Sequence, residues 1–326
     1  MCLFMKQKEL GVIAPDTIDI RDFQIAEIQK QGIELPEEYD LRQKMTPIGL
    51  QNWGSCTSWA GCAIKEYWDK KEYGRDINLS EKFNYYNIKK ISGLWQTEGD
   101  YLRNSIKALC QYGAPLLEDY PDEREGSWKE YISPPPQELY EKAKKYKGKT
   151  YWSVVNTLDS FRRTMFSFKC PIATGMKWYK SYYKEGNDGK LPLPDGDCVG
   201  GHAIACVGWT KDKLWFKNSW GTHYGKEGYF YIPFDEFTKH DFWNAWAILD
   251  EDVPKPEMTE GWVADSWLKS EFTKGEIAWT TYKLNFRTSP WGNVIKTLGK
   301  GDKVKILGET KKDSRGLTWQ KISLIK

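Results

Sequence analysis

Three separated segments of this chain carry a cysteine, a histidine and an asparagine in an order that permits thiol chemistry. QNWGSCTSWAGC holds Cys56 directly before a helical pattern, GGHAIACVGW holds His202 in a strand-like run, and KLWFKNSW ends a second such run near Asn218. Residues far apart in sequence can still form one catalytic group when the fold brings them together. Only a fold that sets a helix start against a β-rich segment, across a groove, unites these three side chains.

Each of these residue types has a definite chemical role. A thiol becomes a nucleophile when a helix N-terminus or a histidine stabilises its thiolate, which suits Cys56 and His202. Asn218 would bond the far ring nitrogen and fix the orientation of the imidazole. Trp220 would cover that bond against water, and Gln51 would direct its amide toward an oxyanion beside the Cys56 backbone N–H.

Every one of these residues also has a structural interpretation. A lone cysteine usually packs in a core, a strand histidine is often satisfied by its neighbours, Asn218 stands in a turn-like NSWG, and Gln51 can be a loop amide. The agreement of three segments favours catalysis. His223 and His240 are interpreted as surface or turn residues. Since His223 has no acidic partner at metal spacing, we expect neither a metal nor a cofactor.

The bulk composition is that of a soluble globular protein with one large and one small domain. The chain has 326 residues, 40% of them hydrophobic and 29% charged, and its net charge of +3 is too small to argue for nucleic acid or a membrane surface. No segment reaches the apolar length of a membrane span, and the N-terminus lacks a secretory signal pattern. We therefore expect a cytoplasmic protein, or one released without a classical signal.

Cysteine usage indicates a reducing compartment. The seven cysteines are an odd number without a CxxC framework, and most are expected to be small buried side chains. An oxidised pair such as Cys170 with Cys198 stays open.

The hydrophobic periodicity changes along the chain and divides it into segments. Helical patterns begin at Thr57, over 80–92 and over 100–113, whereas short β-rich runs dominate after Tyr151. This predicts an α+β protein with a cleft between a helical half and a β half. The expected segments are a leader over 1–34, the main domain over 35–250, a linker over 251–274 and a small β-barrel over 275–326.

The chain resembles the papain-like cysteine peptidases. LPEEYDLRQKMTPIGLQNWGSCTSWA resembles the start of their mature domain, and GGHAIACVGW and NSWGTHYGKEGYF resemble their histidine and asparagine segments. The resemblance implies a two-subdomain fold over 35–250 and an endopeptidase that cleaves protein or peptide substrates through an acyl-enzyme. It assigns the catalytic roles to Cys56, His202, Asn218 and Gln51.

Several positions depart from the usual pattern of that family. Trp53 stands where the family often has a cysteine, Thr57 replaces a tryptophan, and Gln51 lies one residue closer to the nucleophile than usual. The glycine pair that lines the family's cleft is reduced to Gly99, which becomes the candidate backbone partner for substrate. The leader resembles a pro-segment in position, although it is short for one.

The tail resembles bacterial SH3-like (SH3b) domains. LNFRTSPWGNVIKTLGKGDKVKILGE is similar to the opening of such modules, and WQKI fits their last strand. The resemblance implies a small all-β barrel, a bacterial or phage source, and a cell-wall or protein ligand for a protein that we expect to be monomeric. Two alternatives stay open: a cell-wall peptide hydrolase, although Ser55 stands where such enzymes have an aspartate, and an inactive binding protein on a peptidase scaffold.

Overall fold

The computed structural model divides the described chain into two compact units. One comprises Met1–Thr17 with Gln24–Val253, and the other Ile18–Phe23 with Pro254–Lys326. Much of the predicted leader and linker lies outside the described residues. The residues that the structure describes are 10–17, 22, 24–25, 33–122, 126–184, 188–251, 260–264, 266, 268–269, 277–281, 283–290, 293–314 and 316–324.

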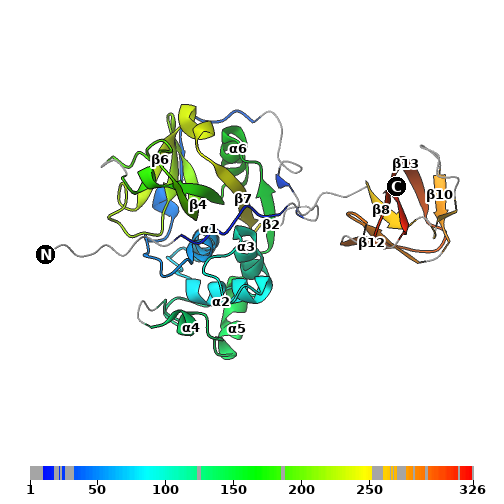
Figure 1. Ribbon diagram of the computed structural model, residues 1–326, viewed down its shortest axis with the longest axis horizontal. Coiled ribbons are helices and arrows are strands. Elements are labelled where there is room, and N and C mark those ends of the chain that lie inside the picture. The colour runs from blue at the N-terminus through cyan, green and yellow to red at the C-terminus, as the bar shows by residue number, and fades with distance from the viewer. Residues whose placement is uncertain are drawn as a thin grey trace. The chain divides into compact units, whose positions relative to one another are not determined.

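The helical half of the larger unit is organised around one long central helix, α1 (Figure 1). Its helices are α1 (Cys56–Tyr73), α2 (Glu81–Ser92), α3 (Leu102–Gln111), α4 (Trp128–Tyr131) and α5 (Glu138–Ala143). The three predicted helical segments are therefore confirmed. Local signals explain their ends, because Gly74 closes α1 in the left-handed region at φ 67° and the Ser80 hydroxyl caps α2 by accepting the Phe83 N–H.

Close packing between α1 and α3 depends on a glycine. A side chain at Gly61 would overlap the Ser105 hydroxyl of α3, so the two helices approach closely at this point. The apolar face of α3 then buries Leu102, Ile106 and Leu109. This contact holds the front of α1, where Cys56 lies, against the rest of the helical half.

The β half is an antiparallel sheet with the strand order β2-β7-β3-β4-β5-β6, to which β1 adds by pairing with β4. Helix α6 (Leu158–Phe168) accompanies it, and short 3-10 helices lie at Arg42–Lys44, Lys144–Tyr146, Lys180–Tyr183 and Phe234–Lys239. The strands are β1 (Tyr39–Asp40), β2 (Thr150–Val154), β3 (Ile172–Tyr179), β4 (Cys198–Thr210), β5 (Lys213–Lys217), β6 (Tyr229–Pro233) and β7 (Phe242–Leu249).

The register of β4 and β5 sets the geometry of the histidine and asparagine segments. Ala205 of β4 pairs with Lys217 of β5, so His202 and Asn218 lie at the same end of the two strands. The Ala203 N–H then reaches the Cys56 sulfur at 3.4 Å. The sheet and the first turn of α1 therefore meet where the three predicted residues stand.

The named elements of the smaller unit are strands. Its strands follow the order β12-β11-β8-β14-β13-β10-β9, around a core that includes Val263, Phe286, Val304, Ile306 and Ile322. The short strands predicted over 275–326 are thus present, and their assignment to an SH3-like barrel stays a prediction. The described part of the predicted linker over 251–274 is not a connector, because Glu260–Ala264 forms a strand between β11 and β14 and Val263 packs in the core. The strands are β8 (Glu260–Ala264), β9 (Leu268–Lys269), β10 (Ile277–Thr280), β11 (Leu284–Arg287), β12 (Val294–Leu298), β13 (Lys303–Lys312) and β14 (Thr318–Leu324).

The described cysteines carry free thiols. These include Cys170 and Cys198, whose pairing as a disulfide the sequence leaves open. Four of them are buried, as expected for small hydrophobic side chains. Within the described part of the chain, no helix has the length and apolarity needed to span a membrane.

Candidate active site

Cys56 is the first residue of α1 and is fully buried. Its sulfur accepts the Ala203 N–H, and the backbone of Gly11 also contacts it. Burial raises the pKa of the Cys56 thiol to about 12, and this outweighs the surrounding backbone N–H groups, which lower it. Burial therefore disfavours the thiolate of Cys56 in the described form.

His202 and Asn218 form a buried hydrogen-bonded pair. The ring Nε2 of His202 lies 2.8 Å from Asn218 Oδ1, which also accepts the Ser219 N–H at 2.8 Å. Because a carboxamide oxygen only accepts, Nε2 is the donor, and in a neutral ring Nδ1 is then the basic nitrogen. The arrangement fixes both the tautomer and the orientation of the imidazole, and the next residue, Ala203, contacts the Cys56 sulfur through its N–H.

Two tryptophans enclose this imidazole. The Trp220 ring stacks on His202 with centroids 4.4 Å apart and an interplanar angle of 24°, and Trp178 meets the same ring edge-on at 4.8 Å. The two rings therefore cover two sides of the imidazole that bonds Asn218. Trp220 was predicted from the sequence, whereas Trp178 was missed. Trp178 lies on β3, two residues after Met176, which pairs with His202 on β4.

Gln51 is joined to the asparagine segment through Ser219. The Ser219 hydroxyl donates to Gln51 Oε1 at 2.6 Å, and the Gln51 N–H donates to the Ser219 carbonyl at 2.8 Å. Gln51 Nε2 donates to the Trp53 carbonyl at 3.1 Å. The amide orientation thus leaves Nε2 as the donor, on the loop that leads to Cys56. Ser219 was also missed, although it directly follows Asn218.

Residues 10–13 cross the site above Cys56. The N–H groups of Gly11 and Val12 donate to the Gly201 carbonyl at 3.1 and 2.9 Å. On the other side, the Asp100 N–H donates to the Gly11 carbonyl at 2.8 Å and the Ile13 N–H to the Asp100 carbonyl at 3.3 Å. This part of the leader therefore bridges backbone groups of the two halves and contacts the thiol.

Gly11 and Gly99 allow this close crossing. A side chain at Gly11 would overlap the Gly54 carbonyl, and one at Gly99, which has a φ of 80°, would overlap the Gly11 backbone. The structure therefore places the predicted Gly99 directly beneath the crossing chain. On this side of the chain, the hydrogen bonds come from its neighbour Asp100, which was not predicted from the sequence.

Side chains of the leader also occupy buried positions. Val12 is 5% exposed and lies against Gly175 of β3. The Asp16 carboxylate accepts the Trp246 indole N–H at 2.8 Å and the Arg103 backbone N–H at 3.2 Å. The leader is thus held by specific contacts beyond its backbone hydrogen bonds.

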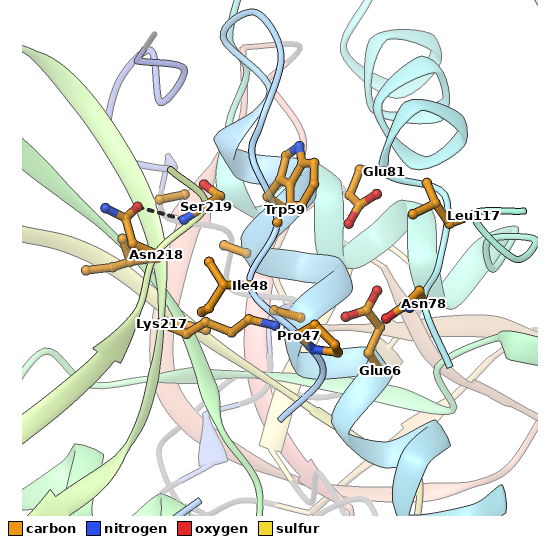
Figure 2. Close-up of a pocket in the computed structure, with 16 residues that line it drawn as sticks. Pro47, Ile48, Trp59, Glu66, Asn78, Glu81, Leu117, Lys217, Asn218 and Ser219 are labelled. Carbon is orange, nitrogen blue, oxygen red and sulfur yellow. Dashed lines mark hydrogen bonds between the residues drawn. The ribbon is translucent and has the colours of Figure 1, made fainter. Parts of the chain in front are cut away.

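A cavity of about 150 Å³, lined by both apolar and charged side chains, lies beside Asn218 and Ser219 (Figure 2). Lys217 donates to the carbonyl and hydroxyl of Thr46 at 2.9 and 3.0 Å, and the Thr46 hydroxyl donates to Glu66 at 2.5 Å. Burial lowers the pKa of Lys217, and burial followed by the nearby Glu66 raises that of Glu81 well above its usual range. This chain of contacts anchors the end of β5 immediately before Asn218.

The other two histidines lie apart from this centre. His223 is exposed. His240, expected at the surface or in a turn, is buried, with Nδ1 2.7 Å from the Tyr182 hydroxyl. Among the residues that the structure describes, no group of three or more His, Cys, Asp or Glu side chains is placed to hold a metal ion.

Comparison with known proteins identifies similar sequences and folds. The family model for papain family cysteine proteases matches residues 35–240. An uncharacterized peptidase C1-like protein, L477, of Acanthamoeba polyphaga mimivirus is 28% identical over 232 residues, which cover 64% of this chain and 72% of the relative. Papain from Carica papaya is 25% identical over 232 residues, which cover 70% of this chain and 63% of papain.

The fold is also similar to solved structures. The cysteine protease xylellain from Xylella fastidiosa superimposes with a TM-score of 0.65 at 26% identity, and the match covers 77% of this chain and all of xylellain. A structure of the mite allergen Blo t 1 matches with a TM-score of 0.54 at 22% identity over 68% of this chain and 73% of that chain. The second likeness supports the fold alone.

Proposed function

The chain belongs to the papain family of cysteine proteases, and on this premise we propose that it is an endopeptidase that acts through Cys56, His202 and Asn218. The observation that carries the proposal is the hydrogen bond of 2.8 Å between His202 and Asn218, beside a thiol at the first residue of a helix. A cysteine peptidase needs this combination of nucleophile, base and orienting amide.

The proposed reaction proceeds in two stages. His202 accepts the proton of the Cys56 thiol, the sulfur attacks the peptide carbonyl carbon, and the C–N bond breaks as the imidazolium protonates the leaving amine. The resulting thioester is hydrolysed by water, whose proton His202 accepts. The free acid leaves and the thiol is restored.

Charge that develops on the carbonyl oxygen requires donors. The Cys56 backbone N–H and Gln51 Nε2 are the proposed pair, with Ser219 holding the Gln51 amide so that nitrogen is the donor. Removal of one such donor typically costs about 3–4 kcal/mol of transition-state stabilisation.

The leader is the proposed regulator of this site. Its backbone occupies the hydrogen-bonding groups of Asp100 and Gly201, and Gly11 contacts the Cys56 sulfur. Val12 pairs parallel to Asp100 and antiparallel to Gly201. A substrate peptide therefore has to displace residues 10–13 before its carbonyl can reach the thiol.

For the smaller unit, the proposal is an SH3-like module that directs the peptidase to a surface or partner. The support is its continuous antiparallel strand order and the apolar core that includes Phe286 and Ile322. The LNFR segment that suggested the likeness forms β11.

Cys56→Ala tests the catalytic assignment. We expect hydrolysis of a peptide library and labelling by an epoxide thiol reagent to be lost, because the nucleophilic sulfur is gone. The assay is run on the full chain before and after limited proteolysis of the leader, with far-UV circular dichroism as the folding check. Cys62→Ala, which removes another buried thiol of the same helix, is the matched control and should stay active. Hydrolysis by folded Cys56→Ala would end the assignment.

A further inference from the structure

The backbone of Asp100 borders the path of residues 10–13 over Cys56, which we call the groove. Its N–H and C=O both point at the crossing chain, with hydrogen bonds of 2.8 Å to Gly11 and 3.3 Å from Ile13. An extended substrate that replaces the leader meets the same two groups. Asp100 belongs to the loop between α2 and α3 and not to the main sheet, so sheet hydrogen bonds do not fix the position of its backbone. Other contacts have to hold this backbone within hydrogen-bonding distance of the crossing chain.

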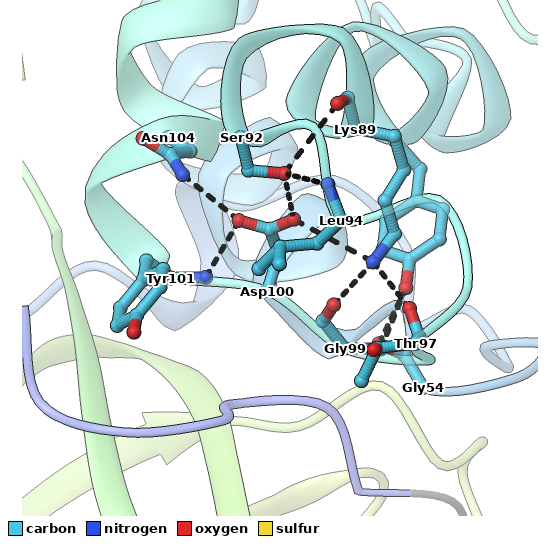
Figure 3. A network of polar contacts seen from close by, with 10 residues as sticks. Gly54, Lys89, Ser92, Leu94, Thr97, Gly99, Asp100, Tyr101 and Asn104 are labelled. Atoms are coloured by element: carbon cyan, nitrogen blue, oxygen red, sulfur yellow. Dashed lines mark hydrogen bonds and ion pairs between the residues drawn. The ribbon is translucent and has the colours of Figure 1, made fainter.

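A buried lysine lies directly behind this loop (Figure 3). Lys89 of α2 is fully buried, and its ammonium donates to the Thr97 carbonyl at 2.6 Å and to the Gly99 carbonyl. It also lies 3.5 Å from Asp100 Oδ2. Lys89 therefore binds the carbonyls of the loop that point away from the groove.

The Asp100 carboxylate completes the support from the same side. One oxygen accepts the Ser92 hydroxyl at 2.6 Å, and the other accepts the Tyr101 N–H and the Asn104 amide, both at 2.8 Å. With its side chain fully buried and held in this way, Asp100 directs its backbone N–H and C=O at Gly11 and Ile13.

A single hydroxyl connects the loop to the nucleophile segment. Tyr85 accepts the Gly99 N–H at 2.8 Å and donates to the Gly54 carbonyl at 3.2 Å. Gly54 stands two residues before Cys56. Tyr85 therefore fixes the position of the loop relative to the Cys56 sulfur as well as relative to α2.

Stability alone does not account for this cluster. Removing a lysine and a carboxylate from water is costly, and well-packed apolar residues often stabilise a core as well or better. The groups that the lysine satisfies are loop carbonyls beside the site. The contacts therefore specify a position for the backbone of residues 97–100.

We propose that Lys89 and Tyr85 are positioning residues, which hold the Asp100 backbone where it binds the main chain of a substrate. The inference rests on the proposed function, because it concerns the same groove. Neither side chain touches the reacting atoms. Their loss should weaken recognition of peptides while leaving the chemistry of the thiol intact.

The test compares two reagents that both alkylate Cys56. A peptidyl epoxide needs the Asp100 backbone, whereas iodoacetamide does not, and both need the leader displaced. The ratio of their second-order rate constants therefore cancels any change in leader opening. For Lys89→Met and for Tyr85→Phe we expect this ratio to fall by about tenfold, as the loss of roughly one to two hydrogen bonds predicts.

Matched controls lie on the same helix. Lys90→Met and Tyr86→Phe change the adjacent lysine and tyrosine, which do not share the hydrogen bonds that Lys89 and Tyr85 make to the loop, and both should keep the wild-type ratio. Thermal unfolding of every variant reports stability separately. If Lys89→Met does not fold, Tyr85→Phe, which removes one oxygen, decides the test.

The outcomes separate the two proposals. Wild-type protein that neither reagent labels at Cys56, even after the leader is cleaved, would overturn the proposed function and this inference with it. Labelled wild type together with an unchanged ratio in folded Tyr85→Phe and Lys89→Met would overturn the inference alone. A lower melting temperature with an unchanged ratio has the same meaning, since it shows a purely structural role.

Discussion

Burial, more than the nearby backbone N–H groups, sets the pKa of the Cys56 thiol. The sulfur stands at a helix N-terminus and accepts backbone N–H groups, which favour a thiolate, yet burial raises its pKa to about 12. The covering chain at Gly11 contributes to this burial. We therefore expect Cys56 to react only after the leader uncovers it, because water and His202 can then stabilise the negative charge of the thiolate.

Ser219 offers a direct test of the amide orientation of Gln51. Ser219→Ala removes the donor to Gln51 Oε1, so we expect kcat to fall about threefold to tenfold with little change in KM, in line with the loss of one hydrogen bond. Steady-state kinetics with a fluorogenic peptide measure this. In a Gln51→Ala background the same change should have no further effect. An additional loss there would show that Ser219 acts through another group.

His240 should make the larger unit sensitive to acid. Burial lowers its pKa to about 4, against the opposing influence of Glu236 and Asp241. Between pH 6.5 and 4 the unfolded chain binds a proton that the folded chain does not, so the free energy of unfolding falls with decreasing pH, by up to about 3 kcal/mol. Urea unfolding between pH 4 and 7 measures this. His240→Gln should flatten the dependence, and an unchanged slope would exclude His240 as its source.

At the scale of elements, the leader forms isolated β-bridges through Val12 and is also held by side-chain contacts such as those of Asp16. Asp16→Ala removes the acceptor of the Trp246 indole and of the Arg103 N–H, so the leader should open more often. We expect iodoacetamide to label Cys56 about tenfold faster, which corresponds to the loss of roughly 1–2 kcal/mol of hydrogen bonding. Mass spectrometry follows the labelling.

The control for this change is Asp159→Ala, which removes an exposed carboxylate that pairs with Arg163 on α6. Its labelling rate should match the wild type. Equal rates in Asp16→Ala and wild type would mean that the backbone hydrogen bonds alone hold the leader.

The helices were predictable from sequence, whereas the path of the leader was not. Periodic apolar residues, the Ser80 cap and a glycine at Gly74 are local signals, and they set the extents of α1 and α2. Residues 10–16 carry no such pattern, because their partners Asp100 and Gly201 lie far along the chain. A strand that pairs with distant backbone has no periodicity of its own to reveal it.

At the scale of the molecule, every candidate site residue belongs to the larger unit. A chain that ends at Val253 should therefore hydrolyse a small peptide with a kcat/KM within about twofold of the full chain, since separate domains keep their own cores. Scanning calorimetry should show one transition fewer for this shorter chain. A loss of activity greater than about tenfold, with the fold retained, would show that the smaller unit takes part in catalysis.

The sequence by itself determined which residues are chemically capable of thiol catalysis, and where the helices and strands that carry them begin. Both depend on residue type and local spacing, which a single chain displays. The tertiary structure alone decided that the Asp100 backbone meets residues 11 and 13. It also decided that Ser219 bonds the Gln51 amide and that Lys89 bonds the carbonyl of Gly99. These contacts join residues from separate elements, and packing fixes them only after the chain has folded.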